Sequence, residues 1–261
     1  MPITKDRLSS KPEPVSGKEP LEIREFSSLY DVAKNYTETI KKTIEKTRKN
    51  NEDTNAALEE VDKLYIEDNF VKEEADLCAI LSNVKLFLDV DERMQKIRDE
   101  KNKTKDPKRE RELDQQLRLE KNTIIPFNHQ VRDFLLENGD FISPVQMSSL
   151  LAKMNNGITA PFDRLIIGLQ AEVAVLNLIK EIPDITARPA TELEDARGVD
   201  IVISSPQLLE LDIKTGGGQG DGLGRQNELD IDRNNLNNRS FELTPLGKHE
   251  VTKELRERLQ K

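Results

Sequence analysis

The chain has 261 residues, of which 35% are hydrophobic and 34% are charged, and this apolar share is low for one compact domain. Forty Lys and Arg against 49 Asp and Glu give a net charge of −9, which argues against a protein that holds nucleic acid by overall positive charge alone. The single cysteine, Cys78, excludes an intramolecular disulfide and a cysteine-based zinc site. No run of about 20 apolar residues is present, so we expect no membrane-spanning helix and a cytoplasmic protein.

The first half of the chain is expected to be helical. Prolines and serines crowd residues 1–20, which we predict to be a disordered tail. Residues 21–121 contain no glycine and one proline, Pro107, and their apolar residues recur at three- and four-residue steps. This pattern predicts long amphipathic helices. The heptad register slips at Asp68, which favours a helical hairpin or bundle over a coiled-coil oligomer, although the second alternative stays open.

Shorter helices are expected over residues 122–156. Pro126 is predicted to open one that ends near Asn138, and Ser143 is predicted to cap the next, which stops at Asn156. His129 lies in this stretch among charged residues, and we expect it to be solvated, as we expect of His249. Cys78 falls on the apolar stripe and is expected to be a core residue. Residues 21–156 are therefore predicted to form one helical domain.

The pattern changes after residue 157. We predict an α+β or α/β arrangement here, a small domain over residues 157–261 following the long helical half. Its expected elements are a helix over 162–182, a β-hairpin of strands 199–204 and 208–215 around Pro206, a glycine loop over 216–224, a short strand over 241–244 and a helix over 247–260.

Four ionisable residues stand out in this second half. Asp200 lies in a strand that is otherwise apolar, and Asp212 and Lys214 share one face of the next strand, since side chains alternate along a strand. Glu172 is the lone acid of a helix that is apolar nearly all round. Charges in such surroundings are costly unless they are paired or used, so either a partly buried ion-pair set or a functional site is indicated.

These residues resemble the PD-(D/E)XK nuclease superfamily, the restriction-endonuclease-like enzymes. The resemblance covers residues 157–215 and depends on the order Gly168-x-x-Ala171-Glu172, then Gly198-Val-Asp200-Ile, then Asp212-Ile213-Lys214. Val199 replaces the proline that the family has before its first aspartate. A glycine loop and an Asn-rich stretch replace the helix and strands that usually follow the lysine strand.

The resemblance implies a metal-dependent nuclease that hydrolyses phosphodiester bonds of DNA, with RNA not excluded. Asp200, Asp212 and the backbone carbonyl of Ile213 would hold Mg²⁺ or Mn²⁺, Glu172 would reach the metal through water, and Lys214 would orient or help to deprotonate the attacking water. Arg225, Arg233 and Arg239 are candidate phosphate contacts.

The alternative is a non-catalytic helical interaction protein that keeps a degenerate nuclease fold. In either case the N-terminal helices could mediate a homo-oligomer or bind a protein partner.

Overall fold

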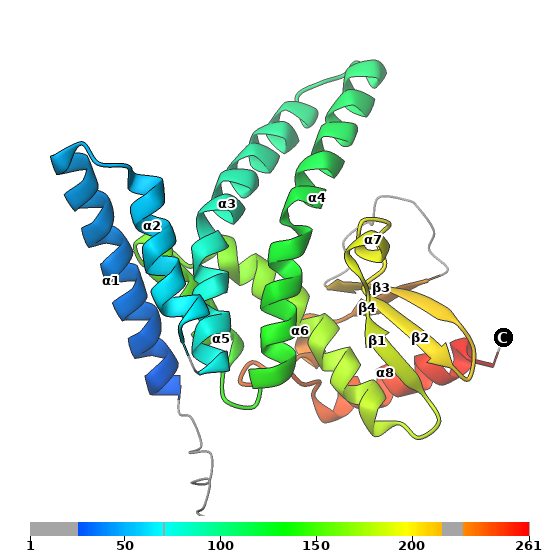
Figure 1. Ribbon diagram of the computed structural model, residues 1–261. Helices are drawn as coiled ribbons and strands as arrows, with labels where there is room; N and C mark the ends of the chain where they lie inside the picture. Colours follow the sequence, from blue (N-terminus) through cyan, green and yellow to red (C-terminus); the bar gives the residue numbers. More distant parts are fainter. Residues whose placement is uncertain (1–25, 70, 216–226, 261) are drawn as a thin grey trace, which may run out of the picture.

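The computed structural model describes residues 26–69, 71–215 and 227–260 (Figure 1). The tail predicted over residues 1–20, the glycine loop over 216–224 and Arg225 lie outside these ranges. The first half is helical, as predicted, and residues 26–121 contain no strand in their described part. Its elements are α1 (Phe26–Asn50), α2 (Thr54–Asp62), η1 (Lys63–Glu67), α3 (Lys72–Lys101), α4 (Pro107–Asn138), α5 (Pro144–Ala152) and η2 (Lys153–Asn155).

Helices α3 and α4 form a long antiparallel hairpin that stands out from the rest of the molecule (Figure 1). Asp106 caps α4, because its side chain accepts the Lys108 N–H at 2.9 Å, and Pro107 occupies the first helical position. The prediction that Pro126 opens a helix is wrong, because Pro126 lies inside α4. Ile125 and Phe127 are buried on either side of Pro126, and Phe127 packs into the core of the N-terminal helices, which favours a helix that continues through the proline.

The N-terminal helices share one hydrophobic core. It contains buried side chains from α1, α3, α4 and α5, among them Tyr36, Leu81, Phe127 and Leu150. Cys78 is also buried there, as predicted. Ser143 caps α5 in a capping box with Gln146, which confirms the predicted start of that helix. None of the helices in the described part of the chain is both long and apolar enough to span a membrane.

The second half contains one four-stranded mixed sheet in its described residues, in the order β1-β2-β3-β4. Strands β1, β2 and β3 are antiparallel neighbours, and β4 runs parallel to β3. The hairpin was predicted, whereas β1 and β4 were not. The elements are α6 (Ala160–Glu181), β1 (Thr186–Pro189), α7 (Glu192–Asp195), β2 (Ile201–Ser205), β3 (Leu209–Thr215), β4 (Glu228–Ile231), η3 (Arg233–Asn235) and α8 (Pro245–Arg258).

A strand and a helix therefore do follow the lysine strand, contrary to the departure noted in the sequence. The short strand predicted over 241–244 is reduced to one bridge, between Leu236 and Leu243. Helices α6 and α8 pack against apolar residues of the sheet in a second core, which includes Ile201, Leu211 and Leu229. The molecule is thus an α+β protein with a helical half and a small mixed sheet.

Helix α6 belongs to both cores. Leu169 and Val173 pack with the N-terminal helices, while Ala171 and Ala174 pack with the sheet. In Figure 1 this helix runs from the helical half to the sheet. Glu172 lies where these two sets of side chains interleave along the helix.

Candidate functional site

The start of β2 brings Asp200 beside β3. Ile201 pairs with Leu211, yet the Asp200 N–H also donates to the Leu211 carbonyl, at 2.8 Å. Asp200 and Ile201 thus both face Leu211 of β3, which is the arrangement of a β-bulge. A bulge changes the direction of the side chain of the extra residue, here Asp200. The Asp200 side chain turns towards β3, where its Oδ2 accepts the Ile213 N–H at 2.6 Å.

The same hydrogen bond fixes the direction of the Ile213 backbone. Asp212 donates its N–H to Asn227 on the β4 side, so the alternate residue Ile213 directs its N–H and its carbonyl towards β2. The Ile213 carbonyl, which was predicted to be a metal ligand, therefore faces the side on which the Asp200 carboxylate lies.

Asp200 occupies a strained electrostatic position. Burial raises its pKa, the Ile213 N–H lowers it, and the neighbouring charge of Asp212 raises it again, to about 7. Lys214 lowers this pKa and Asp195 raises it by smaller amounts. Asp200 is therefore close to half-protonated at neutral pH, in the absence of any added cation.

Glu172 approaches from α6, and its pKa is raised well above the ordinary value. Burial is the largest cause and the charge of Asp200 is the next, whereas Arg132 and Lys214 lower it. Glu172 therefore interacts electrostatically both with Asp200 and with Lys214 of β3.

Lys214 and Asp212 form an ion pair on β3. Burial lowers the pKa of Lys214, but the hydrogen bond to Asp212 and the charges of Asp212, Asp200 and Glu228 together raise it above its ordinary value. Lys214 is therefore charged at neutral pH and is surrounded by carboxylates.

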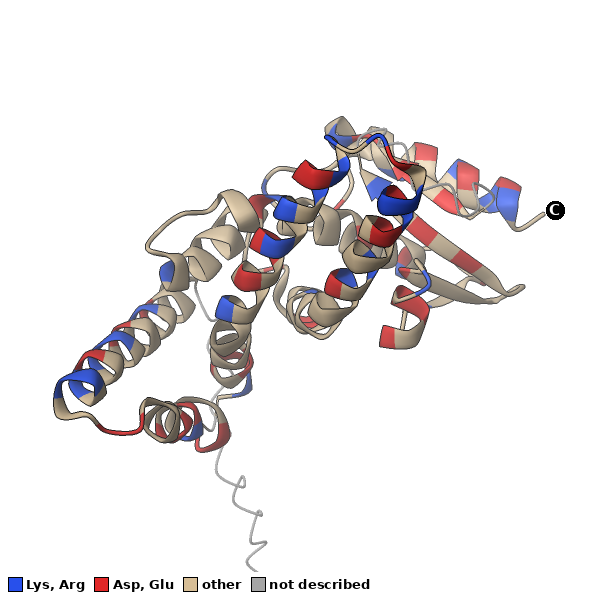
Figure 2. Ribbon diagram, turned by 90° about the horizontal axis from the view of Figure 1, so that it is seen from above, with Lys and Arg blue, Asp and Glu red and all other residues tan. Residues whose placement is uncertain are grey.

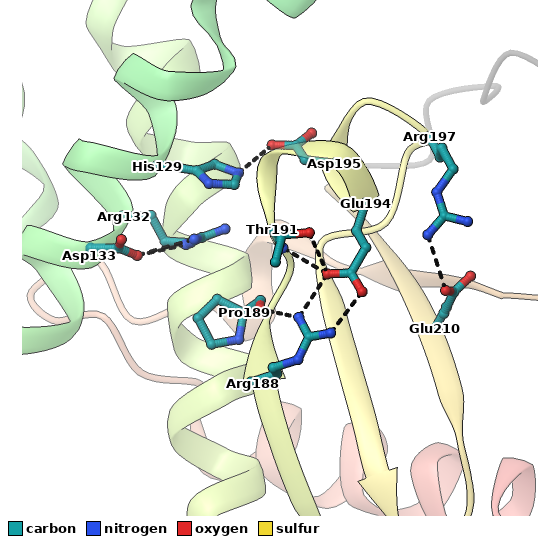
Figure 3. Close-up of polar contacts among 10 residues, drawn as sticks. All are labelled: His129, Arg132, Asp133, Arg188, Pro189, Thr191, Glu194, Asp195, Arg197 and Glu210. Atoms are coloured by element: carbon teal, nitrogen blue, oxygen red, sulfur yellow. Dashed lines mark hydrogen bonds and ion pairs between the residues drawn. The ribbon is translucent and has the colours of Figure 1, made fainter.

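Helix α4 contributes two side chains that the sequence did not indicate. The prediction that His129 is solvated is wrong, because its side chain is only 12% exposed and its Nε2 lies 2.9 Å from Asp195 Oδ2 (Figure 3). Arg132, one helical turn later, is 3% exposed and pairs with Asp133. Both were missed because their partner Asp195 and their neighbour Glu172 are more than 35 residues away in sequence. His249 is exposed, as predicted.

Asp195 is held in place by the short helix α7. Thr191 and Glu194 form a capping box at its start, and Arg188 binds Glu194 through two nitrogens, each at 2.7 Å (Figure 3). These bonds hold the pKa of Glu194 well below its usual range, and the hydrogen bond from Arg188 is the largest cause. These contacts stabilise helix α7, whose last residue, Asp195, faces His129 of α4.

The candidate phosphate contacts lie elsewhere. Arg233 is exposed in η3, and Arg239 is exposed beside a cavity of about 360 Å³. That cavity lies between the α4–α5 loop, α6 and the residues around Phe241, where the buried Ser240 Oγ has no hydrogen-bond partner in the described structure. Among the described residues, no hydrogen bond or ion pair joins Arg233 or Arg239 to Asp200.

The donor atoms fit a hard cation. In the described residues, no three or more His, Cys, Asp or Glu side chains converge as a metal-binding group. Mg²⁺, however, often takes only one or two carboxylates and keeps several waters, and oxygen is the donor it prefers. Asp200, Asp212 and the Ile213 carbonyl supply that type of donor set.

Comparison with known proteins adds no family assignment: no family model, curated protein or solved structure matches this chain.

Proposed function

We propose that the chain is a metal-dependent nuclease that hydrolyses phosphodiester bonds of DNA. The observation that carries this proposal is the bulge that turns Asp200 towards Ile213, the residue between Asp212 and Lys214. Glu172 of α6 is close enough for the charge of Asp200 to raise its pKa further, beyond the rise that burial causes. Carboxylates crowded in this way repel each other, and a divalent cation would compensate their charge.

The roles follow from the chemistry of each group. Asp200, Asp212 and the Ile213 carbonyl would hold Mg²⁺, or Mn²⁺ in its place. When bound, such an ion lowers the pKa of water and neutralises charge on the phosphate. The raised pKa of Lys214 favours one of its two candidate roles: a charged ammonium orients the attacking water and faces the phosphate, rather than removing a proton. Glu172 would act on the metal's water shell.

One observation favours the non-catalytic alternative. Lys214 is already paired with Asp212, and one oxygen of Asp200 is already used by the Ile213 N–H. A degenerate site that survives as an ion-pair set would contain the same contacts. The chain would then serve as an interaction module, with its N-terminal helices binding a protein partner or a second copy.

Cleavage assays separate the two functions. Linear DNA, plasmid DNA and single-stranded RNA are incubated with the protein in Mg²⁺, in Mn²⁺ or in EDTA. We expect metal-dependent cleavage of DNA, and a loss of at least about a hundredfold in Asp212→Asn and in Lys214→Ala. Lys253→Ala and Glu192→Gln are the controls, because both side chains are exposed and lie outside the site. Cleavage at the wild-type rate in Asp212→Asn, or none in any metal, would remove the nuclease and leave the interaction module.

A further inference from the structure

Positive charge gathers at the end of the α3–α4 hairpin, although the chain as a whole is acidic. Residues 96–111 contain eight Lys or Arg against four Asp or Glu, a net charge of +4, which leaves −13 for the rest of the chain. Figure 2 shows blue segments at the loop between the two helices and on the adjoining turns.

Most of these cations are available to a ligand. Lys101 and Arg109 pair with acidic residues of the hairpin itself, and Lys96 pairs with Glu92. Five others are exposed, and no ion pair is found for them among the described residues: Arg98, Lys103, Lys105, Lys108 and Arg111. A cluster of unpaired cations on a protruding end is the electrostatic pattern that attracts a polyanion.

A second basic segment ends α1, where residues 41–50 hold five cations and one acid. Two of its lysines are already engaged, since Lys41 binds Asn156 and Lys42 pairs with Glu38. The hairpin end therefore offers more unpaired charge, and it alone is continuous with the helix that reaches the candidate site.

The hairpin also has a suitable length. Helix α4 carries Pro107 at its outer end and His129, which contacts Asp195, 22 residues later. At 1.5 Å per residue the two positions are about 33 Å apart. This span is close to the rise of one turn of duplex DNA, about 34 Å.

We propose that the end of the α3–α4 hairpin is a phosphate-binding arm for duplex DNA, which it contacts about one helical turn from the site. DNA is named as the ligand, rather than another polyanion, because the inference rests on the proposed nuclease function. The contact is to the sugar–phosphate backbone, because Lys and Arg donate to phosphate oxygens and most protein–DNA hydrogen bonds go to phosphate and sugar. An acidic protein segment is the competing ligand.

Binding in EDTA tests the arm without requiring cleavage. Fluorescence anisotropy of a labelled duplex of about 30 base pairs is measured over a range of KCl concentrations. The arm variant carries Lys103→Gln, Lys105→Gln, Lys108→Gln and Arg111→Gln. The control variant carries Lys34→Gln, Lys63→Gln, Lys85→Gln and Arg256→Gln, four exposed cations outside the arm that change the net charge equally. Thermal melts check that both variants are folded.

The logarithm of the DNA-binding constant falls with the logarithm of the salt concentration, and we expect the slope of this plot to decrease by about one for each phosphate contact that the arm variant loses. The arm variant should also lose at least about a hundredfold in affinity near 0.1 M salt. The control variant should bind within about threefold of the wild type, because distant charges are screened beyond about 10 Å at that salt.

Equal losses in the two variants, or wild-type affinity in the arm variant, would overturn the proposal. Absence of DNA binding by the wild type at low salt would also overturn it and would point to an acidic protein ligand. Binding that depends on the arm, without cleavage, would support the arm and refute the nuclease. Cleavage together with binding that does not depend on the arm would support the nuclease and refute the arm.

Discussion

Replacing Asp200 with asparagine should make the metal-free protein relatively more stable as the pH rises. The folded-state pKa of Asp200, about 7, lies above its ordinary value of 3.8. Between these two values the folded protein binds more protons than the unfolded chain, so the free energy of unfolding falls as the pH rises through this window. Below about pH 4 the penalty is absent, and above about pH 7 it is complete. The asparagine side chain would remove the charge and keep an oxygen for the Ile213 N–H.

The size of the effect follows from the shift. A rise from 3.8 to about 7 corresponds to about 4 kcal/mol as an upper limit. Partial exposure of the side chain and relaxation around it screen the charge, so we expect about 1–2 kcal/mol. The amide oxygen is a weaker acceptor than the carboxylate, which costs about 1 kcal/mol, but this cost is the same at every pH. It therefore cancels when differences between two pH values are compared.

The measurement is urea denaturation of the wild type and of Asp200→Asn at pH 5 and pH 8, in EDTA. The difference in unfolding free energy should shift in favour of the variant by about 1–2 kcal/mol between the two pH values. In Mg²⁺ the wild type should gain stability by mass action, and the variant should not. A constant difference across this range would refute the reasoning, because it would mean that Asp200 is charged in the folded protein throughout. A shift in the opposite direction would assign Asp200 to a stabilising ion pair.

Two further predictions concern the support of the site and the backbone. A double-mutant cycle of His129→Ala and Asp195→Asn, measured by urea denaturation, should give a coupling free energy of about 1 kcal/mol, because the two side chains form a partly buried pair between α4 and α7. If the changes in unfolding free energy of the two single variants simply add in the double variant, the contact contributes no stability. Gly247→Ala should lower the melting temperature, since its Cβ would lie 2.7 Å from the Asn235 carbonyl oxygen, whereas Gly168→Ala meets no atom within 4 Å and should stabilise α6 by about 0.5–1 kcal/mol. Equal shifts in the two glycine variants would contradict the packing around α8.

The elements that were predicted correctly are those whose signal is local. Asp106-Pro107 and Ser143-Pro144 each combine a cap with a proline at the first helical position, and both start a helix as expected. The same rule, that a proline marks the first turn of a helix, gave a wrong prediction at Pro126. There the burial of Ile125 and Phe127 on either side favours a continuous helix. Strands β1 and β4 have four residues each, too short for an alternating pattern to be distinguished from a loop.

The candidate site divides in the same way. Asp200, Asp212, Lys214 and Glu172 could be selected because a charge in an apolar strand or helix is unusual in its own sequence neighbourhood. His129, Arg132 and Asp195 lie in polar stretches, where one more charge is not unusual. Only the folding of α4 against α7 brings His129 to Asp195, and only the folded chain brings Arg132 close enough to Glu172 to lower its pKa. The bulge at Asp200 depends on the pairing of two strands and likewise has no mark in the sequence.

The double membership of α6 has a consequence for how the molecule can be divided. A fragment that begins at residue 157 would retain Glu172 and the whole sheet, but it would uncover Phe162, Ile166 and Leu169, which are buried against the N-terminal helices. Such a fragment would expose a continuous apolar stripe to water and tend to aggregate. Since one rigid helix contributes to both cores, the two halves should also lose their structure in a single cooperative transition. Shortening the chain for experiments should therefore be done at its ends, and not between the helices and the sheet.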